Sequence, residues 1–398
     1  MGGLTHLIVF ISMFAATTLI SEAQYILPIF KHEPSKQFYT LIYIGSAATS
    51  SPVNLLLDLG TNITWLNCRD IKSLSSLRLV TCESSTCKSI SGNGCDGKIC
   101  LYREPSPFLL TNHTVTKTDR VVQDKATLFS TESGIPPSLV SFRPFTFSCA
   151  VQKNLQGLAP PISGVIGLSS AELPFWRQVT SAFNVIPKFA LCLPSSSVGT
   201  FYMGATSSFN TPLFGGNNPI PMTMTPLKIE SGKYLISVTS IYVDGIPLAL
   251  NPSLLKGGAK LSAVVPYTVL QTDIYNALAQ SFTLNATKIG MSETTGHAPF
   301  KHCFEEGASG KTMDVSVMEI ALPGNGKEVK WRFQGANMVE RVSETVICLA
   351  FVDGGNKPTE SMVIGTHQLQ DYLIQFDFST GRLAFSDPLL LHNTSCST

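Results

Sequence analysis

Residues 54–67 read NLLLDLGTNITWLN, and this stretch poses the question that the rest of the chain must answer. Three leucines precede Asp58, Gly60-Thr61 close the turn behind it, and Trp65 follows as a large aromatic residue. An acid at the tip of an apolar strand, closed by a Gly-Thr turn, indicates one half of a two-aspartate catalytic site. Such a site needs a second carboxylate that shares a proton with the first. The chain must therefore supply another acid of the same kind elsewhere.

Length and composition bound the fold and exclude several classes of function. The 398 residues exceed what one hydrophobic core normally serves, so we expect two lobes, and the 44% hydrophobic content supplies their interiors. The net charge is +1, only 14% of residues are charged, and Lys and Arg are scattered along the chain. The sequence therefore gives no support for binding to nucleic acid or to anionic lipid through a positively charged surface. No G-x-S-x-G, P-loop or H-E-x-x-H motif occurs. We expect no nucleic-acid partner, no metal and no cofactor.

The amino terminus has the pattern of a targeting segment. An apolar run over residues 7–20 is followed by Ser21-Glu22-Ala23, with small residues where a signal peptidase cleaves. A membrane anchor is the alternative, but the run is short for a span, which needs about 18 apolar residues. We therefore expect residues 1–23 to be a signal peptide, and the mature protein to be secreted into the extracellular space and cell wall, free of the membrane.

The cysteines agree with secretion. Ten are present, and an even number in a secreted chain predicts up to five disulfides. A zinc site is the alternative for the cluster between residues 68 and 100, but the cluster lacks paired C-x-x-C spacing. N-glycosylation sequons occur at Asn62, Asn112, Asn285 and Asn393. Of these, we expect Asn112, Asn285 and Asn393 to carry glycans.

Short β-branched or aromatic runs, broken by Gly, Pro, Asn and Ser, follow one another along the chain. Those that predict strands are 38–44, 53–57, 142–147, 234–243 and 373–378. Helical patterns are few and short, at 173–183 and 272–282, so the protein is predicted to be mostly β. A loop-rich stretch over 206–226 predicts a linker between an N-terminal lobe, 24–205, and a C-terminal lobe, 227–398.

A faint internal repeat supports two related lobes. Asp58 is followed 109 residues later by Gly167, the last residue of Gly-Val-Ile-Gly. In the second half, Ser262 of Lys-Leu-Ser-Ala is followed 103 residues later by Gly365, the last residue of Met-Val-Ile-Gly. Each half thus pairs a strand that has a polar tip with an apolar-apolar-Gly partner at nearly the same distance.

This organisation resembles that of the pepsin-like aspartic proteases, in which two lobes each supply an Asp-Thr/Ser-Gly loop. The first loop matches at Asp58, Gly60 and Trp65 and departs at Leu59, where the family has a hydroxyl residue. In the second loop, the aspartate position is occupied by Ser262 and the glycine position by Val264. A single carboxylate leaves no shared proton and no paired acid, so Asp58 is expected to be vestigial.

The chain is similar to one plant group of catalytically defective relatives. The similarity is carried by the first and second loops and by three further segments: Lys188–Leu193, Pro266–Leu270 and Ile364–Asp371. That group includes xylanase inhibitors, xyloglucan-endoglucanase inhibitors, the carrot-type dermal glycoprotein and the basic globulins of legume seeds. The resemblance implies a mostly β, bilobal pepsin-like fold with few short helices. It also implies an extracellular protein that binds and inhibits microbial cell-wall glycoside hydrolases. We expect this protein to be a monomer. Storage, signalling or peptide binding, and residual aspartic endopeptidase activity, are the alternatives.

The same resemblance implies the cross-links and the inhibitory residues. The implied disulfides are Cys68–Cys149, Cys82–Cys100, Cys87–Cys95, Cys192–Cys396 and Cys303–Cys348. In hydrolase-inhibiting relatives, contacts come from the loop after the first cysteine of the second lobe and from the tail before the last cysteine. Those contacts correspond here to Lys311, in the 304–312 loop, and to His392. A cationic or imidazole donor suits the paired carboxylates of a glycosidase.

Overall fold

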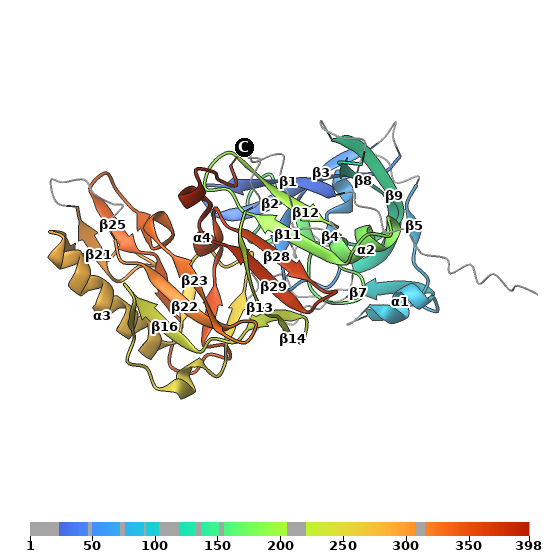
Figure 1. The fold of residues 1–398 in the computed structure, drawn as a ribbon. Coiled ribbons are helices and arrows are strands. Elements are labelled where there is room, and N and C mark those ends of the chain that lie inside the picture. The colour runs from blue at the N-terminus through green and yellow to red at the C-terminus, as the bar shows by residue number, and fades with distance from the viewer. Residues whose placement is uncertain are drawn as a thin grey trace, which may run out of the picture.

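The computed structural model describes residues 24–46, 50–71, 76–90, 93–102, 119–132, 137–150, 155–204, 220–306 and 315–397. The expected signal peptide, most of the expected linker, Asn112 and Lys311 lie outside these ranges. Strands dominate the described residues, as predicted, and the four α-helices among them are α1 (Ser85–Ser89), α2 (Phe175–Ala182), α3 (Thr272–Lys288) and α4 (Thr366–Leu369). Figure 1 shows two lobes, with β11, β28 and β29 between them.

The first lobe is built on one large sheet that also receives the last strands of the chain. Its path runs β13-β29-β28-β11-β12-β1-β2-β3-β10-β4-β9-β8-β7-β6, and β5 pairs with β8. The bounds are β1 (Tyr25–His32), β2 (Gln37–Ile44), β3 (Ser51–Asp58), β4 (Trp65–Leu66), β5 (Arg78–Leu79), β6 (Asn93–Asp96), β7 (Ile99–Tyr102), β8 (Asp119–Ser130), β9 (Ser138–Cys149), β10 (Gly164–Gly167), β11 (Lys188–Cys192), β12 (Val198–Met203), β13 (Met222–Pro226), β28 (Leu373–Asp377) and β29 (Arg382–Ser386).

Three smaller sheets, with α3, form the second lobe. Their orders are β14-β15-β18-β27-β19-β26, β17-β16-β22-β23 and β20-β21-β25-β24. The bounds are β14 (Lys228–Glu230), β15 (Lys233–Ile236), β16 (Ser240–Val243), β17 (Ile246–Pro247), β18 (Ala259–Leu261), β19 (Thr268–Leu270), β20 (Ser292–Thr294), β21 (Cys303–Glu305), β22 (Met318–Pro323), β23 (Glu328–Phe333), β24 (Val339–Arg341), β25 (Val346–Leu349), β26 (Phe351–Asp353) and β27 (Met362–Ile364).

The lobes are joined by sheet hydrogen bonds and by aromatic packing. β11 of the first lobe pairs antiparallel with β28, from near the end of the chain. On these strands Phe189 stacks on Phe376, with ring centroids 4.6 Å apart. Trp176 of α2 stacks on Phe378, the residue that follows β28, with ring centroids 4.0 Å apart. Burial of such large rings contributes strongly to a core. The two lobes therefore share a packed seam.

The internal repeat is present as two equivalent strand triplets. β10 lies parallel to β3 and antiparallel to β4, and β27 lies parallel to β18 and antiparallel to β19. The Gly167 N–H donates to Thr64 Oγ1 at 3.2 Å, and the Gly365 N–H donates to Thr268 Oγ1 at 3.1 Å. A Cβ on either glycine would collide with backbone atoms, at 2.7 Å from the oxygen of Thr61 and at 2.5 Å from the carbonyl carbon of Tyr267. Each triplet therefore requires its glycine.

Two expected elements differ from those observed. Residues 234–243 are not one strand but two, β15 and β16, which belong to different sheets. The chain changes sheets at Thr239, whose N–H and side-chain hydroxyl both donate to the Ala321 carbonyl. Helix α3 continues past residue 282 to Lys288, because the buried side chains of Phe282 and Ala286 extend its apolar face by another turn.

Five disulfides cross-link the described residues, and two of the implied pairings are wrong. Cys68–Cys149, Cys192–Cys396 and Cys303–Cys348 are bonded as expected. The other two bonds are Cys82–Cys95 and Cys87–Cys100, not Cys82–Cys100 and Cys87–Cys95.

Burial explains this exchange of partners. β6 and β7 form a hairpin in which Cys95 stands opposite Cys100, but only Cys100 is buried. Cys87 lies on the buried side of α1, in the same apolar cluster as Cys100. Cys82 precedes that helix and is partly accessible, while Cys95 is exposed. The two buried sulfurs therefore bond to each other, and the two more accessible sulfurs form the second bridge.

Candidate functional site

Asp58 ends β3 and turns its carboxylate back onto its own loop. Its Oδ1 accepts a hydrogen bond from the Gly60 N–H at 2.8 Å, and its Oδ2 accepts one from Thr61 Oγ1 at 2.7 Å. Burial raises the pKa of the Asp58 carboxyl, although these two bonds and the charge of Lys260 act in the opposite direction. The first loop is thus intact and holds an acid with a perturbed pKa, which is typical of a functional site.

Ser262 occupies the equivalent position after β18. Its Oγ accepts hydrogen bonds from the N–H groups of Val264, at 3.2 Å, and Val265, at 3.1 Å. The serine is only 6% exposed. A hydroxyl therefore does for the second loop what the carboxylate does for the first, since it satisfies loop donors that would otherwise be unpaired. It supplies no second acid.

Val264, where the family has glycine, also changes the surface between the lobes. Its half-buried side chain packs against a first-lobe cluster that includes Leu56, Trp65 and Val165. Leu59, the departure in the first loop, is 3% exposed and belongs to the main hydrophobic core. Both departures therefore serve packing, and neither offers a polar atom to a reacting group.

The nearest downstream acid does not replace the missing one. Asp273 lies in the first turn of α3, where its backbone N–H and its carboxylate both bond to the Gln271 side chain. Residues 259–268, which form the second loop and its flanking strands, contain no Asp or Glu. The arrangement cannot hold two carboxylates that share a proton, which the acid–base mechanism requires.

A second candidate site is formed by the tail. His392 ends the 3-10 helix η7 (Leu389–His392) and is exposed. Beside it, Leu390 and Leu391 are 58% and 53% exposed. The resemblance pointed to His392, and the structure presents its imidazole on the surface, on a segment separate from the Asp58 and Ser262 loops. Lys311, the other expected contact residue, lies outside the described residues.

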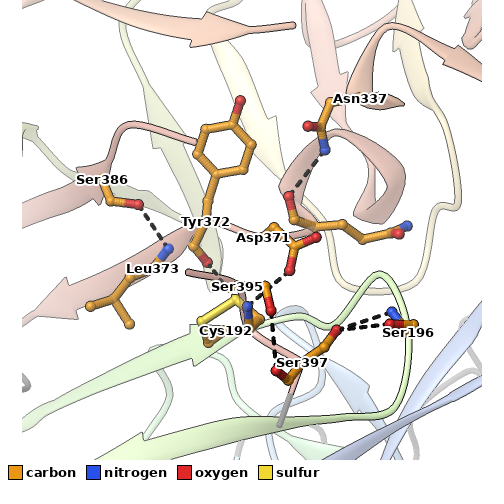
Figure 2. Close-up of a disulfide and its surroundings, with 11 residues drawn as sticks. Cys192, Ser196, Asn337, Asp371, Tyr372, Leu373, Ser386, Ser395 and Ser397 are labelled. Atoms are coloured by element: carbon orange, nitrogen blue, oxygen red, sulfur yellow. Dashed lines mark hydrogen bonds between the residues drawn. A yellow bond between two sulfur atoms is a disulfide. The ribbon is translucent and has the colours of Figure 1, made fainter. Parts of the chain in front are cut away.

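One residue that the sequence did not single out holds this tail. Asp371 is 4% exposed and adopts a left-handed conformation with φ of 57°. Its Oδ1 accepts from the Cys396 N–H at 2.9 Å, and its backbone oxygen accepts from the Leu389 N–H at 2.9 Å. Figure 2 shows the carboxylate beside the Cys192–Cys396 bridge. Asp371 lies in the quoted segment 364–371, but nothing in the sequence indicates a partner 25 residues away.

The described sequons differ in their surroundings. Asn285 lies in α3 and is half-buried, and its Nδ2 donates to the Asp244 carboxylate and to Ser316 Oγ. Asn393 follows η7, is exposed and has φ of 54°. Asn112 lies outside the described ranges. Within those ranges, no cluster of three His, Cys, Asp or Glu side chains could hold a metal ion, and no helix is long and apolar enough to cross a membrane.

Comparisons with known proteins agree with this geometry. Residues 38–205 match the family described as xylanase inhibitor N-terminal, and residues 233–387 match xylanase inhibitor C-terminal. A probable aspartic proteinase, GIP2, of Nicotiana benthamiana is 33% identical over 96% of this chain and 94% of its own length. Gamma conglutin 1 of Prunus dulcis is 34% identical over 86% and 82%, respectively. The crystal structure of edgp is 30% identical, with a TM-score of 0.81 over 95% of this chain and 98% of that one.

Proposed function

The chain belongs to the xylanase-inhibitor family of aspartic-protease-like proteins, and we propose that it is a secreted, monomeric, proteolytically silent inhibitor of microbial cell-wall glycoside hydrolases. The observation that carries the proteolytic silence is Ser262 at the position of the second acid, 6% exposed and committed to two backbone N–H groups. Secretion is supported by the five disulfides, which persist in oxidising compartments.

The inhibitory role is supported by the chemistry of the exposed tail. Glycoside hydrolases act through two carboxylates roughly 5–9.5 Å apart, which accept charge-assisted hydrogen bonds. The imidazole of His392 is a donor of the right kind, and it stands on a segment whose two ends are held by Asp371. A fixed donor loses less conformational entropy on binding than a free one. Two exposed leucines beside it add apolar area that a hydrolase surface could bury.

The test is inhibition of a panel of secreted xylanases and xyloglucanases by the purified mature protein, freed of N-linked glycans. For a responsive hydrolase, His392→Ala is expected to weaken inhibition by about 30-fold, the equivalent of a hot-spot loss of about 2 kcal/mol. His297→Ala is the matched control, because His297 is also exposed in the second lobe but lies far from the tail in sequence.

The outcomes separate the parts of the proposal. Failure of the mature protein, freed of N-linked glycans, to inhibit any hydrolase in the panel contradicts the proposed function itself. Inhibition that is equally strong in wild type and His392→Ala from pH 5 to 7.5 contradicts only the role of His392. Equal losses in His392→Ala and His297→Ala would mean that the effect is one of general surface charge rather than of a specific contact.

A further inference from the structure

The tail loop, residues 389–396, is a small closed loop pinned at both ends. Asp371 accepts the Leu389 N–H with its backbone oxygen and the Cys396 N–H with its carboxylate, both at 2.9 Å. Cys396 is bonded to Cys192, and both cysteines are fully buried. Just beyond the loop, Ser397 Oγ accepts from the Ser196 N–H at 3.1 Å (Figure 2). The residues between the two pinned ends, 390–395, therefore cannot move far from the protein surface.

The middle of the tail loop contains an N-glycosylation sequon next to the candidate inhibitory histidine. Asn393-Thr394-Ser395 follows His392 directly. Asn393 is exposed, and its left-handed conformation is one that asparagine tolerates better than most residues. Its backbone N–H donates to the Leu390 carbonyl at 3.3 Å, and no hydrogen bond of its side chain to any described residue is present. The side-chain amide is thus free to carry a substituent without loss of a contact.

Asn285 provides the contrast. Its Nδ2 donates to both Asp244 and Ser316, and Asp244 Oδ1 in turn accepts from the Val317 N–H at 2.8 Å. A glycosylated amide keeps only one N–H, so a glycan there would remove one of the two hydrogen bonds of a half-buried side chain. The folded protein accommodates a glycan at Asn393 with less disturbance than at Asn285.

We propose that Asn393 carries an N-linked glycan in the secreted protein, and that this glycan blocks the tail loop from entering a hydrolase cleft. In the attachment step, the Asn393 amide nitrogen bonds to the anomeric carbon of a lipid-pyrophosphate-linked oligosaccharide, loses one proton and releases the lipid pyrophosphate. Glycan occupancy then divides the protein into a silent form and an inhibitory form. This inference rests on the proposed function, because it concerns the regulation of the same surface.

The geometry explains why the glycan would block the site. Consecutive Cα atoms are about 3.8 Å apart, and Asn393 directly follows His392, so the glycan would be attached to the residue next to the histidine. Glycans are bulky and strongly hydrated. Because both ends of the tail loop are pinned, the chain cannot turn Asn393 away while it presents His392 and Leu391. A hydrolase would have to strip water from the glycan or be held off by it.

The experiment compares sequon variants expressed in a glycosylating eukaryotic host. Thr394→Ala removes the sequon and leaves Asn393 in its left-handed conformation, Asn393→Gln removes the attachment atom, and Thr394→Ser keeps the sequon as the matched control. Peptide mass spectrometry measures occupancy at Asn393 and Asn285, and the inhibition constant is measured against a responsive hydrolase. We expect high occupancy at Asn393 and lower occupancy at Asn285. We also expect Thr394→Ala and Asn393→Gln to inhibit at least about tenfold more strongly than wild type and Thr394→Ser.

Each outcome has one meaning. An unoccupied Asn393 in the wild-type protein overturns the inference. So does an occupied Asn393 with the same inhibition constant in all four proteins, which leaves the proposed function standing. If neither unglycosylated variant inhibits any hydrolase in the panel, the proposed function fails and the blocking role fails with it, whatever the occupancy.

Discussion

The bridge between Cys192 and Cys396 is predicted to stabilise the whole protein as well as the tail. The perturbation is the double variant Cys192→Ala/Cys396→Ala, which removes both sulfurs and leaves no free thiol. These cysteines are 204 residues apart in sequence. The Cys303–Cys348 bridge lies between them and closes its own loop of 45 residues, which shortens the path through the cross-linked chain. The effective loop closed in the unfolded chain is therefore about 160 residues, and the chain-entropy relation gives about 5 kcal/mol for it.

That figure is an upper limit, because unfolded chains retain some compactness and measured bridges typically contribute about 2–4 kcal/mol. We expect the double variant to lose about 2–4 kcal/mol in the free energy of unfolding, measured by urea denaturation with tryptophan fluorescence. The control is Cys303→Ala/Cys348→Ala, whose loop of 45 residues gives about 4 kcal/mol by the same relation. The two variants should thus be destabilised by similar amounts.

Their local effects should differ, and this difference tests the reasoning. In the tail variant, the amides of Leu389 and Cys396 lose the tether that keeps them close to Asp371, so hydrogen exchange in the segment 389–397 should accelerate. In the control variant the exchange of this segment should remain as in wild type. A tail variant that loses less than about 1 kcal/mol, with unchanged tail exchange, would show that Asp371 and the surrounding packing hold the tail without the bridge.

Two further predictions concern the loops of Asp58 and Ser262. Wild type is expected to show no pepstatin-sensitive cleavage of denatured globin between pH 2 and 6, and Ser262→Asp alone to stay far below ordinary protease rates. In that variant Val264 still occupies the glycine position, and restoring one member of a set of acid–base groups that act as a unit recovers little of the rate. Cleavage of globin by Ser262→Asp at an ordinary protease rate would contradict this prediction. Burial raises the pKa of the Asp58 carboxyl in the folded protein above its usual value of about 3.9. The free energy of unfolding therefore falls as pH rises from about 4 through the folded-state pKa, because the carboxyl ionises more readily in the unfolded chain. Asp58→Asn should therefore raise the free energy of unfolding at pH 7 but not at pH 3.5, and a pH-independent effect in denaturant titrations would argue against burial as the cause.

Much of the fold could be predicted from local patterns, because strands leave a short-range signature. The runs at 38–44, 53–57 and 373–378 became β2, β3 and β28 with shifts of a few residues at their ends. The repeat predicted which strands are equivalent, since a polar strand tip and a distant Gly partner both follow from the pairing of β3 with β10. The pairing of β11 with β28 could not be predicted in this way, because it depends on contacts across nearly half of the chain.

The candidate site was predictable only where chemistry, rather than packing, determined the residue. The loss of the acid at Ser262 could be predicted from residue identity alone. The exchanged disulfides could not be predicted, because sequence spacing does not distinguish one bridge from the other: both observed bridges span 13 residues. Only the burial of Cys87 on one side of α1 separates the two possibilities. The tail-holding role of Asp371 likewise depends on a fold that brings Cys396 beside it.

The two loops explain how the fold can persist without the chemistry. In the first loop, the Asp58 carboxylate accepts a backbone N–H and a hydroxyl, and in the second, Ser262 Oγ accepts two backbone N–H groups. Either acceptor satisfies its loop, because hydrogen-bonding capacity, not charge, is what the backbone requires. Proteolysis does require charge, since it needs two carboxylates that share one proton. Replacement of one acid by serine therefore removes the reaction while the loop, the strand triplet and the lobe remain folded. Val264 then packs against the first lobe, and His392 lies exposed on the tail, on a segment separate from both loops.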